Sequence, residues 1–139
     1  MLCLGSGGGQ QAPVLAAAGA MVTSYDLSEN QLAKDRIVAE MHDLPVACIQ
    51  GDMAQMLAFP EARFDLIFHP ISNLFVPDVK SVWKECARVI NPDGVLLAGF
   101  MNPSFFLFDH EEATVIGELT VRHDLPYVEP TCLGGEARE

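Results

Sequence analysis

Short apolar runs alternate with longer stretches of helical periodicity through the first hundred residues of the chain. The apolar runs, which predict five strands, cover residues 2–4, 21–25, 45–50, 64–68 and 95–101. Between them, residues 12–18 and the segments that begin at Ser28 and Asp78 have the residue spacing of helices. Strands that alternate with helices predict an open, mostly parallel α/β sheet with helices on both faces.

The helix that begins at Ser28 carries two local signals. Ser28 and Gln31 have the spacing of a capping box, in which side chains and backbone bond reciprocally at the start of a helix. Ala33, Ile37 and Met41 repeat every four residues, so we expect them to form the buried face of this helix.

The helix that begins at Asp78 has the clearest amphipathic pattern in the chain. Its apolar stripe consists of Val79, Val82, Trp83, Cys86, Val89 and Ile90. Asp78 is a favourable residue for capping the first turn. Residues 91–94, Asn-Pro-Asp-Gly, predict the turn that ends the helix.

The pattern changes near residue 101, which divides the chain into a predicted core, residues 1–101, and an extension, residues 102–139. In the extension, a short edge strand is predicted by Leu119, Val121, Leu125 and Tyr127, and the remainder is predicted to be an acidic tail. At the other end, only three residues of the first strand precede a glycine-rich segment. We therefore expect residues upstream of Met1 to be missing from this chain.

The composition fits one globular domain with an acidic surface. Of 139 residues, half are hydrophobic, and 8 basic against 19 acidic residues give a net charge of −11. Such a surface repels phosphate groups, which disfavours nucleic acids and anionic membranes as partners. The longest apolar stretch, residues 13–22, is too short to span a bilayer.

The cysteines indicate the compartment. Cys3, Cys48, Cys86 and Cys132 lie far apart and form no CxxC or Cys/His motif, so no metal site is predicted. Three of the four lie in apolar runs, and we interpret them as buried free thiols of a reducing compartment. Because the N-terminus also lacks a basic secretory leader, we expect a cytoplasmic protein.

The segment Gly5-Ser6-Gly7-Gly8-Gly9 is the first candidate for chemistry. It lies between a predicted strand and a predicted helix, where an open α/β sheet binds a nucleotide-like ligand. Asp26 ends the next strand, and its carboxylate could accept hydrogen bonds from both hydroxyls of a ribose. The dinucleotide fingerprint GxGxxG would need glycine where this chain has Gln10. The alternative is a glycine-rich turn that serves helix–strand packing alone.

Several short motifs follow one another in a set order. They are Leu2-Cys3-Leu4-Gly5-Ser6-Gly7-Gly8-Gly9, Asp26-Leu27-Ser28, Gly51-Asp52-Met53, Phe64-Asp65-Leu66-Ile67, and the helix, turn and strand of residues 76–96. In this order and spacing, the chain resembles the class I S-adenosylmethionine-dependent methyltransferases, whose fold is a Rossmann-like open sheet. The ordered matches cover residues 2–101, and the specificity lies in their combination rather than in any one motif.

The resemblance implies a site for S-adenosylmethionine, which becomes S-adenosylhomocysteine when its methyl group is transferred. The cofactor-binding residues carried over from the family motifs are Gly5, Ser6, Gly7, Gly9, Asp26, Leu27, Asp52 and Met53. In the family pattern, Asp26 would bind the ribose, Asp52 would contact the adenine amino group, and Met53 would pack on the adenine ring.

Two features depart from the family pattern. Cys3 stands where the first motif usually carries an acid that steadies the glycine loop or approaches the methionine end of the cofactor. The family sheet also ends in a hairpin of a sixth and a seventh strand, which is not identified after Met101. A chain truncated at both ends, or a reduced variant, would explain the second departure.

Candidate catalytic and acceptor-binding residues follow the fourth and fifth strands. Methyl transfer is an in-line displacement, and alignment of the reactants can contribute ~7–11 kcal/mol, so a universal catalytic residue is not expected. His69 is the candidate base; the alternative is a histidine that bonds a loop backbone. Asn73 could orient a substrate or stabilise its turn. Phe105 could line an apolar acceptor pocket or cover the core.

We therefore predict an enzyme, a class I methyltransferase that acts on a small-molecule acceptor. A non-catalytic S-adenosylmethionine-binding module, or a fragment of a larger enzyme, is the alternative that Cys3 and the unidentified hairpin favour. A nicotinamide-dependent oxidoreductase is disfavoured by Gln10. An exposed sheet edge could be covered by a second copy of the chain, which would give a homodimer.

Overall fold

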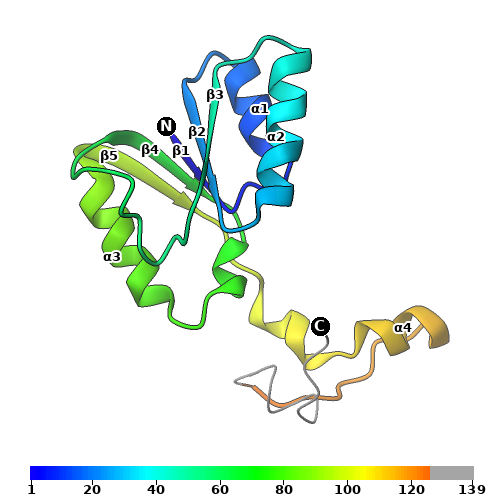
Figure 1. Ribbon diagram of the computed structural model, residues 1–139. Helices are drawn as coiled ribbons and strands as arrows, with labels where there is room; N and C mark the ends of the chain where they lie inside the picture. Colours follow the sequence, from blue (N-terminus) through cyan, green and yellow to red (C-terminus); the bar gives the residue numbers. More distant parts are fainter. Residues whose placement is uncertain (126–139) are drawn as a thin grey trace. The chain divides into compact units, whose positions relative to one another are not determined.

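The computed structural model describes residues 1–125, and the chain divides into two compact units, Met1–Phe100 and Met101–Glu139. Five strands of the first unit form one sheet in the order β3-β2-β1-β4-β5, and every neighbouring pair is parallel (Figure 1). The strands are β1 (Leu2–Leu4), β2 (Val22–Asp26), β3 (Val46–Gln50), β4 (Phe64–His69) and β5 (Ile90–Ala98). The predicted open parallel sheet is confirmed.

Helices cover both faces of this sheet. They are α1 (Gln11–Ala17), α2 (Glu29–Met41), α3 (Val79–Val89) and the short 3-10 helix η1 (Ser72–Phe75). Figure 1 shows α1 and α2 on one side of the sheet and α3 on the other. The three residues of β1 are all apolar because both faces of this strand are buried. Leu2 and Leu4 pack in the core on the α3 side, whereas Cys3 packs against α1.

The larger core lies between the sheet and α3. Tyr25, Phe59 and Phe64 form a chain of ring contacts there, with centroids 5.1 Å and 5.0 Å apart. The α3 stripe predicted from the sequence supplies Val82, Cys86 and Val89 to the same cluster. Burial of each large apolar side chain contributes about 1.5–3 kcal/mol. Because Phe59 belongs to the β3–β4 connection, this core also fixes that connection.

The predicted buried face of α2 is wrong. Ile37 and Met41 are 57% and 73% exposed, and the buried residues of this helix are Leu32, Asp35 and Ala39. The helix turns Asp35 toward the sheet because that carboxylate accepts three hydrogen bonds there.

The predicted capping box is also absent at this helix. Ser28 is the N-cap residue, but its side chain makes no capping hydrogen bond. Its backbone N–H instead donates to Asp26 Oδ1 at 2.8 Å, so the helix start is organised by the last residue of β2. By contrast, the side chain of Asp78 caps α3 as expected, accepting from the N–H of Lys80.

Residues 91–94, which predict a turn, lie within β5 as an irregularity of its ladder. Phe64 pairs with Ile90, and the next pair is Leu66 with Val95. Asn91 Nδ2 donates to Asp65 Oδ1 at 2.6 Å, which ties the irregular segment to β4. The strand predicted for 95–101 therefore begins earlier and ends at Ala98.

The second unit is described by itself. It holds the 3-10 helix η2 (Pro103–Leu107) and helix α4 (His110–Ile116), which Asp109 caps through the N–H of Glu112. Among residues 119–125, one antiparallel bridge, from Val121 to Phe108, stands in place of the predicted edge strand. Tyr127, the last residue of that prediction, lies outside the described residues. Within residues 1–125, every helix is too short or too polar to cross a membrane.

Candidate cofactor site

A cavity of about 690 Å³ opens at the carboxyl ends of the strands. It lies where the chain order reverses between β1 and β4, the position at which open α/β sheets bind their ligands. Six of the eight predicted cofactor residues line it: Gly5, Gly7, Asp26, Leu27, Asp52 and Met53. The remaining lining residues are Ser28, Gln31, Ala54, Ser72, Phe75, Val76, Pro77, Asp78 and Ser81.

The glycine-rich loop passes close to η1 at Gly5. Gly5 has a φ of +58°, and a Cβ there would lie 2.4 Å from the Cβ of Ser72. Ser72 is itself fixed, since its hydroxyl donates to the carbonyl oxygen of Leu4 at 3.1 Å. Both the left-handed backbone and the lack of space therefore require glycine at this position.

Ser6 and Gly9, the other two predicted cofactor residues, face away from the cavity toward α2. The Ser6 hydroxyl and the Gly9 N–H both donate to the carboxylate of Asp35, each at 2.6 Å. Asp35 could not be recognised from the sequence pattern, because an acid in a helix is ordinarily solvated. It is the main site-related residue that pattern analysis missed.

Cys3 does not take over the role of the acid that the family carries at its position. Burial, together with the charge of Asp35, raises the pKa of the Cys3 thiol to about 12. Cys3 is therefore a neutral thiol packed against α1. The carboxylate that contacts the glycine loop is that of Asp35 on α2.

Asp26 ends β2, and Asp52 lies in the loop that follows the neighbouring strand β3. The two strand ends are joined by a hydrogen bond from Gly51 N to Asp26 O at 3.0 Å. Asp26 Oδ1 accepts from the N–H of Ser28, and Asp52 Oδ1 accepts from the N–H of Ala54 at 2.8 Å. Backbone donors thus orient both carboxylates in loops that line the cavity.

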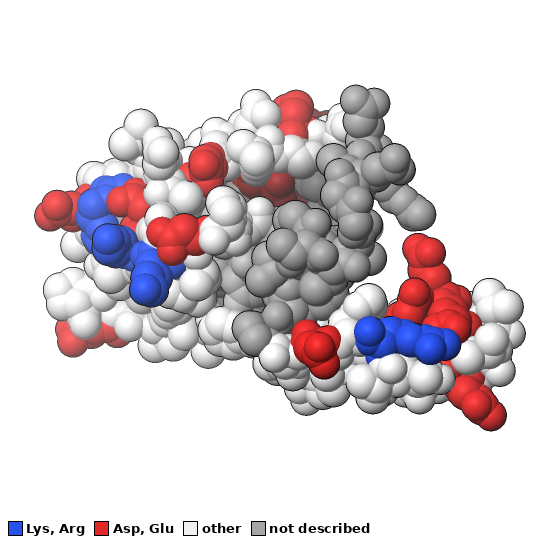
Figure 2. Space-filling model, turned by 90° about the horizontal axis from the view of Figure 1, so that it is seen from below, with Lys and Arg blue, Asp and Glu red and all other residues white. Residues whose placement is uncertain are grey.

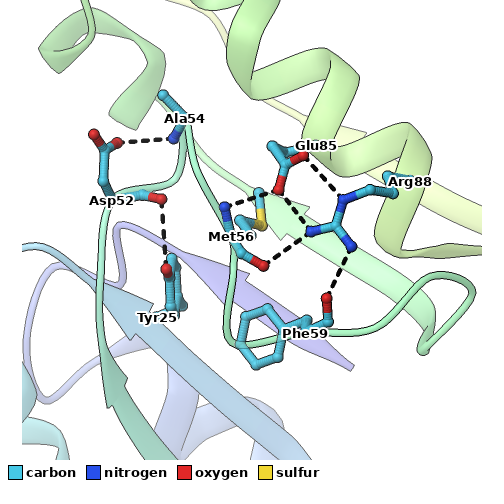
Figure 3. A network of polar contacts seen from close by, with 7 residues as sticks. All are labelled: Tyr25, Asp52, Ala54, Met56, Phe59, Glu85 and Arg88. Atoms are coloured by element: carbon cyan, nitrogen blue, oxygen red, sulfur yellow. Dashed lines mark hydrogen bonds and ion pairs between the residues drawn. The ribbon is translucent and has the colours of Figure 1, made fainter.

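A polar network anchors the segment that follows Asp52 (Figure 3). Arg88 of α3 donates to the carbonyl oxygens of Met56 and Phe59, at 2.9 Å and 2.8 Å, and to both carboxylate oxygens of Glu85. Glu85 accepts in turn from the N–H of Met56. One arginine therefore ties the β3–β4 connection to α3, and with it the wall of the cavity.

The cavity is acidic. Asp26, Asp52 and Asp78 line it, and the described lining residues include no Lys, Arg or His. A hydrogen bond from the Ser81 hydroxyl, with others from the backbone, lowers the pKa of Asp78, so this carboxyl is charged at neutral pH. Such a site favours a ligand with cationic, hydroxyl or amino groups and repels phosphates. On the face drawn in Figure 2, the described basic side chains form small groups beside acidic ones rather than a broad basic surface.

The candidate catalytic residue His69 is buried. Its ring lies edge-on to Trp83, with centroids 5.4 Å apart, and within residues 1–125 neither ring nitrogen has a hydrogen-bond partner. The alternative interpretation, a histidine bonded to a loop backbone, is therefore wrong for the described residues. Burial lowers the pKa of His69, which keeps the ring neutral. It is not among the cavity-lining residues, so its role as a base stays a prediction.

The two predicted acceptor-binding residues lie in different units. Asn73 Nδ2 donates to the carbonyl oxygen of Gly99 at 3.1 Å, a contact that fits the turn-stabilising interpretation. Phe105 belongs to the second unit, where its ring stacks on His110 at a centroid distance of 3.8 Å. A role of either residue in binding an acceptor stays a prediction.

Solved structures with the same fold define the class of protein. The chain matches the PH0226 protein from Pyrococcus horikoshii OT3 with a TM-score of 0.72 at 26% identity, over 81% of this chain and 53% of that one. It matches an S-adenosylmethionine dependent methyltransferase from Mesorhizobium loti with a TM-score of 0.70 at 24% identity, over 88% and 56%. The second likeness shows the fold alone. The fold is that of the class I methyltransferases, as the sequence motifs predicted.

The family follows from the sequence comparisons. Residues 2–98 match the methyltransferase domain family, and the chain belongs to that family. It is 50% identical over 130 residues to the uncharacterized methyltransferase YbaJ of Bacillus subtilis (strain 168), covering 94% of this chain and 51% of YbaJ. It is 31% identical to a ubiquinone biosynthesis O-methyltransferase of Pseudomonas aeruginosa (strain LESB58), covering 100% and 62%. The chain thus spans between half and two thirds of the length of these relatives.

Proposed function

We propose that this chain binds S-adenosylmethionine in the acidic cavity and transfers its methyl group to a small-molecule acceptor. The observation that carries the proposal is a cavity below the glycine loop that has three carboxylates and, among its described lining residues, no basic side chain. The cofactor is a sulfonium cation with ribose hydroxyls and an adenine amino group, all of which suit carboxylates. A nicotinamide dinucleotide is disfavoured by Gln10, which stands where the GxGxxG fingerprint needs glycine.

The proposed roles follow from position. Gly5 and Gly7 let the loop backbone approach the cofactor closely. Asp26 would accept hydrogen bonds from the ribose hydroxyls, and Asp52 from the adenine amino group, while Met53 would pack on the ring. When bound, the cofactor supplies a methyl group on a cationic sulfur. The residues of the chain then orient the reactants, which is the main contribution that an in-line displacement needs.

The small-molecule acceptor is supported by charge and by a relative. The chain carries a net charge of −11, which disfavours nucleic acids. One relative is named for O-methylation in ubiquinone biosynthesis. If the acceptor must lose a proton, the neutral His69 is the proposed base, provided that the acceptor reaches it.

Calorimetric titration with S-adenosylmethionine and S-adenosylhomocysteine tests the cofactor. Asp26→Ala should abolish binding, because it removes the acceptor for the ribose hydroxyls. Glu40→Ala, an exposed acid of α2 outside the cavity, is the matched control and should bind as the unaltered chain does. Binding of NAD, or undiminished binding by Asp26→Ala, would overturn the assignment.

A non-catalytic binding module is the second candidate. It is favoured by Cys3, a buried thiol that stands where the first motif of the family usually carries an acid. Release of S-adenosylhomocysteine, measured against a panel of phenols, amines and carboxylic acids, separates the candidates. Turnover with any acceptor would exclude the module, whereas cofactor binding with no release across the panel would favour it.

We also propose a homodimer and a cytoplasmic location. The dimer is supported by β5, an edge strand whose Val95, Leu96 and Leu97 are 38–52% exposed, and sedimentation analysis over a range of concentrations tests it. A mass that stays monomeric would exclude the dimer. The location is supported by the free thiols Cys3, Cys48 and Cys86, and fluorescence microscopy of the tagged protein in cells tests it.

A further inference from the structure

Asp35 is a buried carboxylate at the back of the glycine loop. It lies on α2 with no exposed surface, and within residues 1–125 no Lys, Arg or His pairs with it. A buried charge is costly unless hydrogen bonds compensate it. Here three donors do so, each at 2.6 Å. Three hydrogen bonds to one buried carboxylate indicate that Asp35 has a role beyond packing.

The two oxygens of this carboxylate reach both ends of the loop. Oδ1 accepts from the backbone N–H of Gly9. Oδ2 accepts from the hydroxyl of Ser6, in the loop, and from the hydroxyl of Ser24, in β2. Asp35 therefore connects the beginning of the loop, its end and the neighbouring strand.

The loop needs an external anchor of this kind. Gly5, Gly7, Gly8 and Gly9 have no side chains with which to pack, and all four have positive φ. Glycine has the largest conformational freedom to lose on ordering. Ser6 is the one residue between Gly5 and Gly9 with a side chain, and that side chain is bonded to Asp35.

We propose that Asp35 is a positioning residue that holds the glycine loop in its cofactor-binding shape through Ser6 and Gly9. This inference rests on the proposed function, since it assigns the loop to a cofactor. Asp35 does not line the cavity, but Gly5 and Gly7, which flank Ser6, do. Fixing Ser6 from behind thus fixes the two residues that face the ligand.

Ser6 and Ser24 form a matched pair for the first test. Both hydroxyls are fully buried and donate to the same oxygen at the same distance, but only Ser6 belongs to the loop. Ser6→Ala and Asp35→Asn should weaken S-adenosylhomocysteine binding on the order of tenfold, as expected for one hydrogen bond to a charged group. Ser24→Ala should lower the melting temperature but change the affinity little. Equal affinity losses for Ser6→Ala and Ser24→Ala, or native affinity in Asp35→Asn, would overturn the proposal.

Amide hydrogen exchange in the cofactor-free protein gives the second test. The Gly9 N–H should exchange faster in Asp35→Ala than in the unaltered chain, while amides of β2 and β4 keep their protection. This readout does not depend on cofactor binding, so it separates the failure of this inference from the failure of the proposed function. If Asp35→Ala does not fold, exchange at Gly9 in Asp35→Asn and Ser6→Ala decides the question. An unchanged Gly9 rate in the folded variants would refute the role of Asp35.

Discussion

Replacing Gly5 and Gly7 one at a time by alanine separates the crowding of the loop from its backbone conformation. Their φ angles are +58° and +68°, so both variants place an L-residue in the left-handed region, at a cost of about 1–2 kcal/mol. The surroundings differ. At Gly5 the new Cβ would lie 2.4 Å from Ser72 Cβ and 2.6 Å from Ser72 Oγ, whereas at Gly7 the nearest atom is Gln11 Nε2 at 3.9 Å.

The crowding at Gly5 adds the cost of overpacking, about 1–3 kcal/mol. We therefore expect Gly5→Ala to lower the free energy of unfolding by about 2–5 kcal/mol, and Gly7→Ala by only about 1–2 kcal/mol. Urea denaturation followed by circular dichroism measures both. The difference should appear in the transition midpoint with an unchanged slope, because the two variants expose the same surface on unfolding.

A third variant tests the cause of the difference. Ser72→Gly removes the Cβ and hydroxyl that Gly5→Ala would meet, and by itself it costs the hydrogen bond to Leu4 O. In the Ser72→Gly background, Gly5→Ala should cost no more than Gly7→Ala does in the unaltered chain. The reasoning would be refuted if Gly5→Ala and Gly7→Ala lowered the free energy of unfolding by amounts within about 0.5 kcal/mol of each other. It would also be refuted if Gly5→Ala cost as much in the Ser72→Gly background as in the unaltered chain.

Three further predictions concern pH, thiol reactivity and the β3–β4 connection. Burial lowers the pKa of His69, so below about pH 6.5 the unfolded chain takes up a proton that the folded chain resists, and stability should fall as the pH drops through that value. His69→Phe should flatten this fall in thermal melts, and an identical pH dependence in both proteins would contradict it. Burial raises the pKa of Cys3 and Cys86 to about 12, so both thiols should resist iodoacetamide in the native protein and react after unfolding. Peptide mass spectra measure this, and rapid alkylation of the native protein would contradict it. Arg88→Lys keeps the charge but loses the fork that reaches two carbonyl oxygens, so it should speed amide exchange in the β3–β4 connection. The exposed pair of Arg36 with Glu29 offers Arg36→Lys as the control, and equal exchange in the two variants would exclude the anchoring role.

The strands and the glycine loop could be predicted because their signals are local. Each strand is a short apolar run, and strands that alternate with helices leave a parallel sheet as the natural arrangement. Asp26 follows from the same logic, since it ends the strand next to the glycine loop. Asp52 was predicted through the resemblance to the methyltransferase family, and six of the eight residues carried over from that family line one cavity.

The face of α2 could not be predicted, because its apolar residues do not mark it. Ile37 and Met41 repeat with helical spacing and yet are exposed, while a carboxylate takes the buried position. The buried position of Asp35 is stabilised by three hydrogen bonds to residues 11 to 29 positions away in the chain. No local sequence pattern predicts contacts over such separations. The irregularity of β5 likewise involves residues far apart in the chain, since Asn91 donates a hydrogen bond to Asp65 of β4.

The sequence by itself determined the class of fold, the position of the glycine loop and the acid that ends β2, because apolar periodicity and turn residues act within a few positions. Only the tertiary structure decided which side chains contact that loop from the side away from the cavity, and which are buried outside the cavity. Asp35 is brought to Ser6, and His69 is enclosed beside Trp83, by the packing of helices against the sheet. Packing of this kind joins residues far apart in the chain, where a single sequence carries no spacing signal.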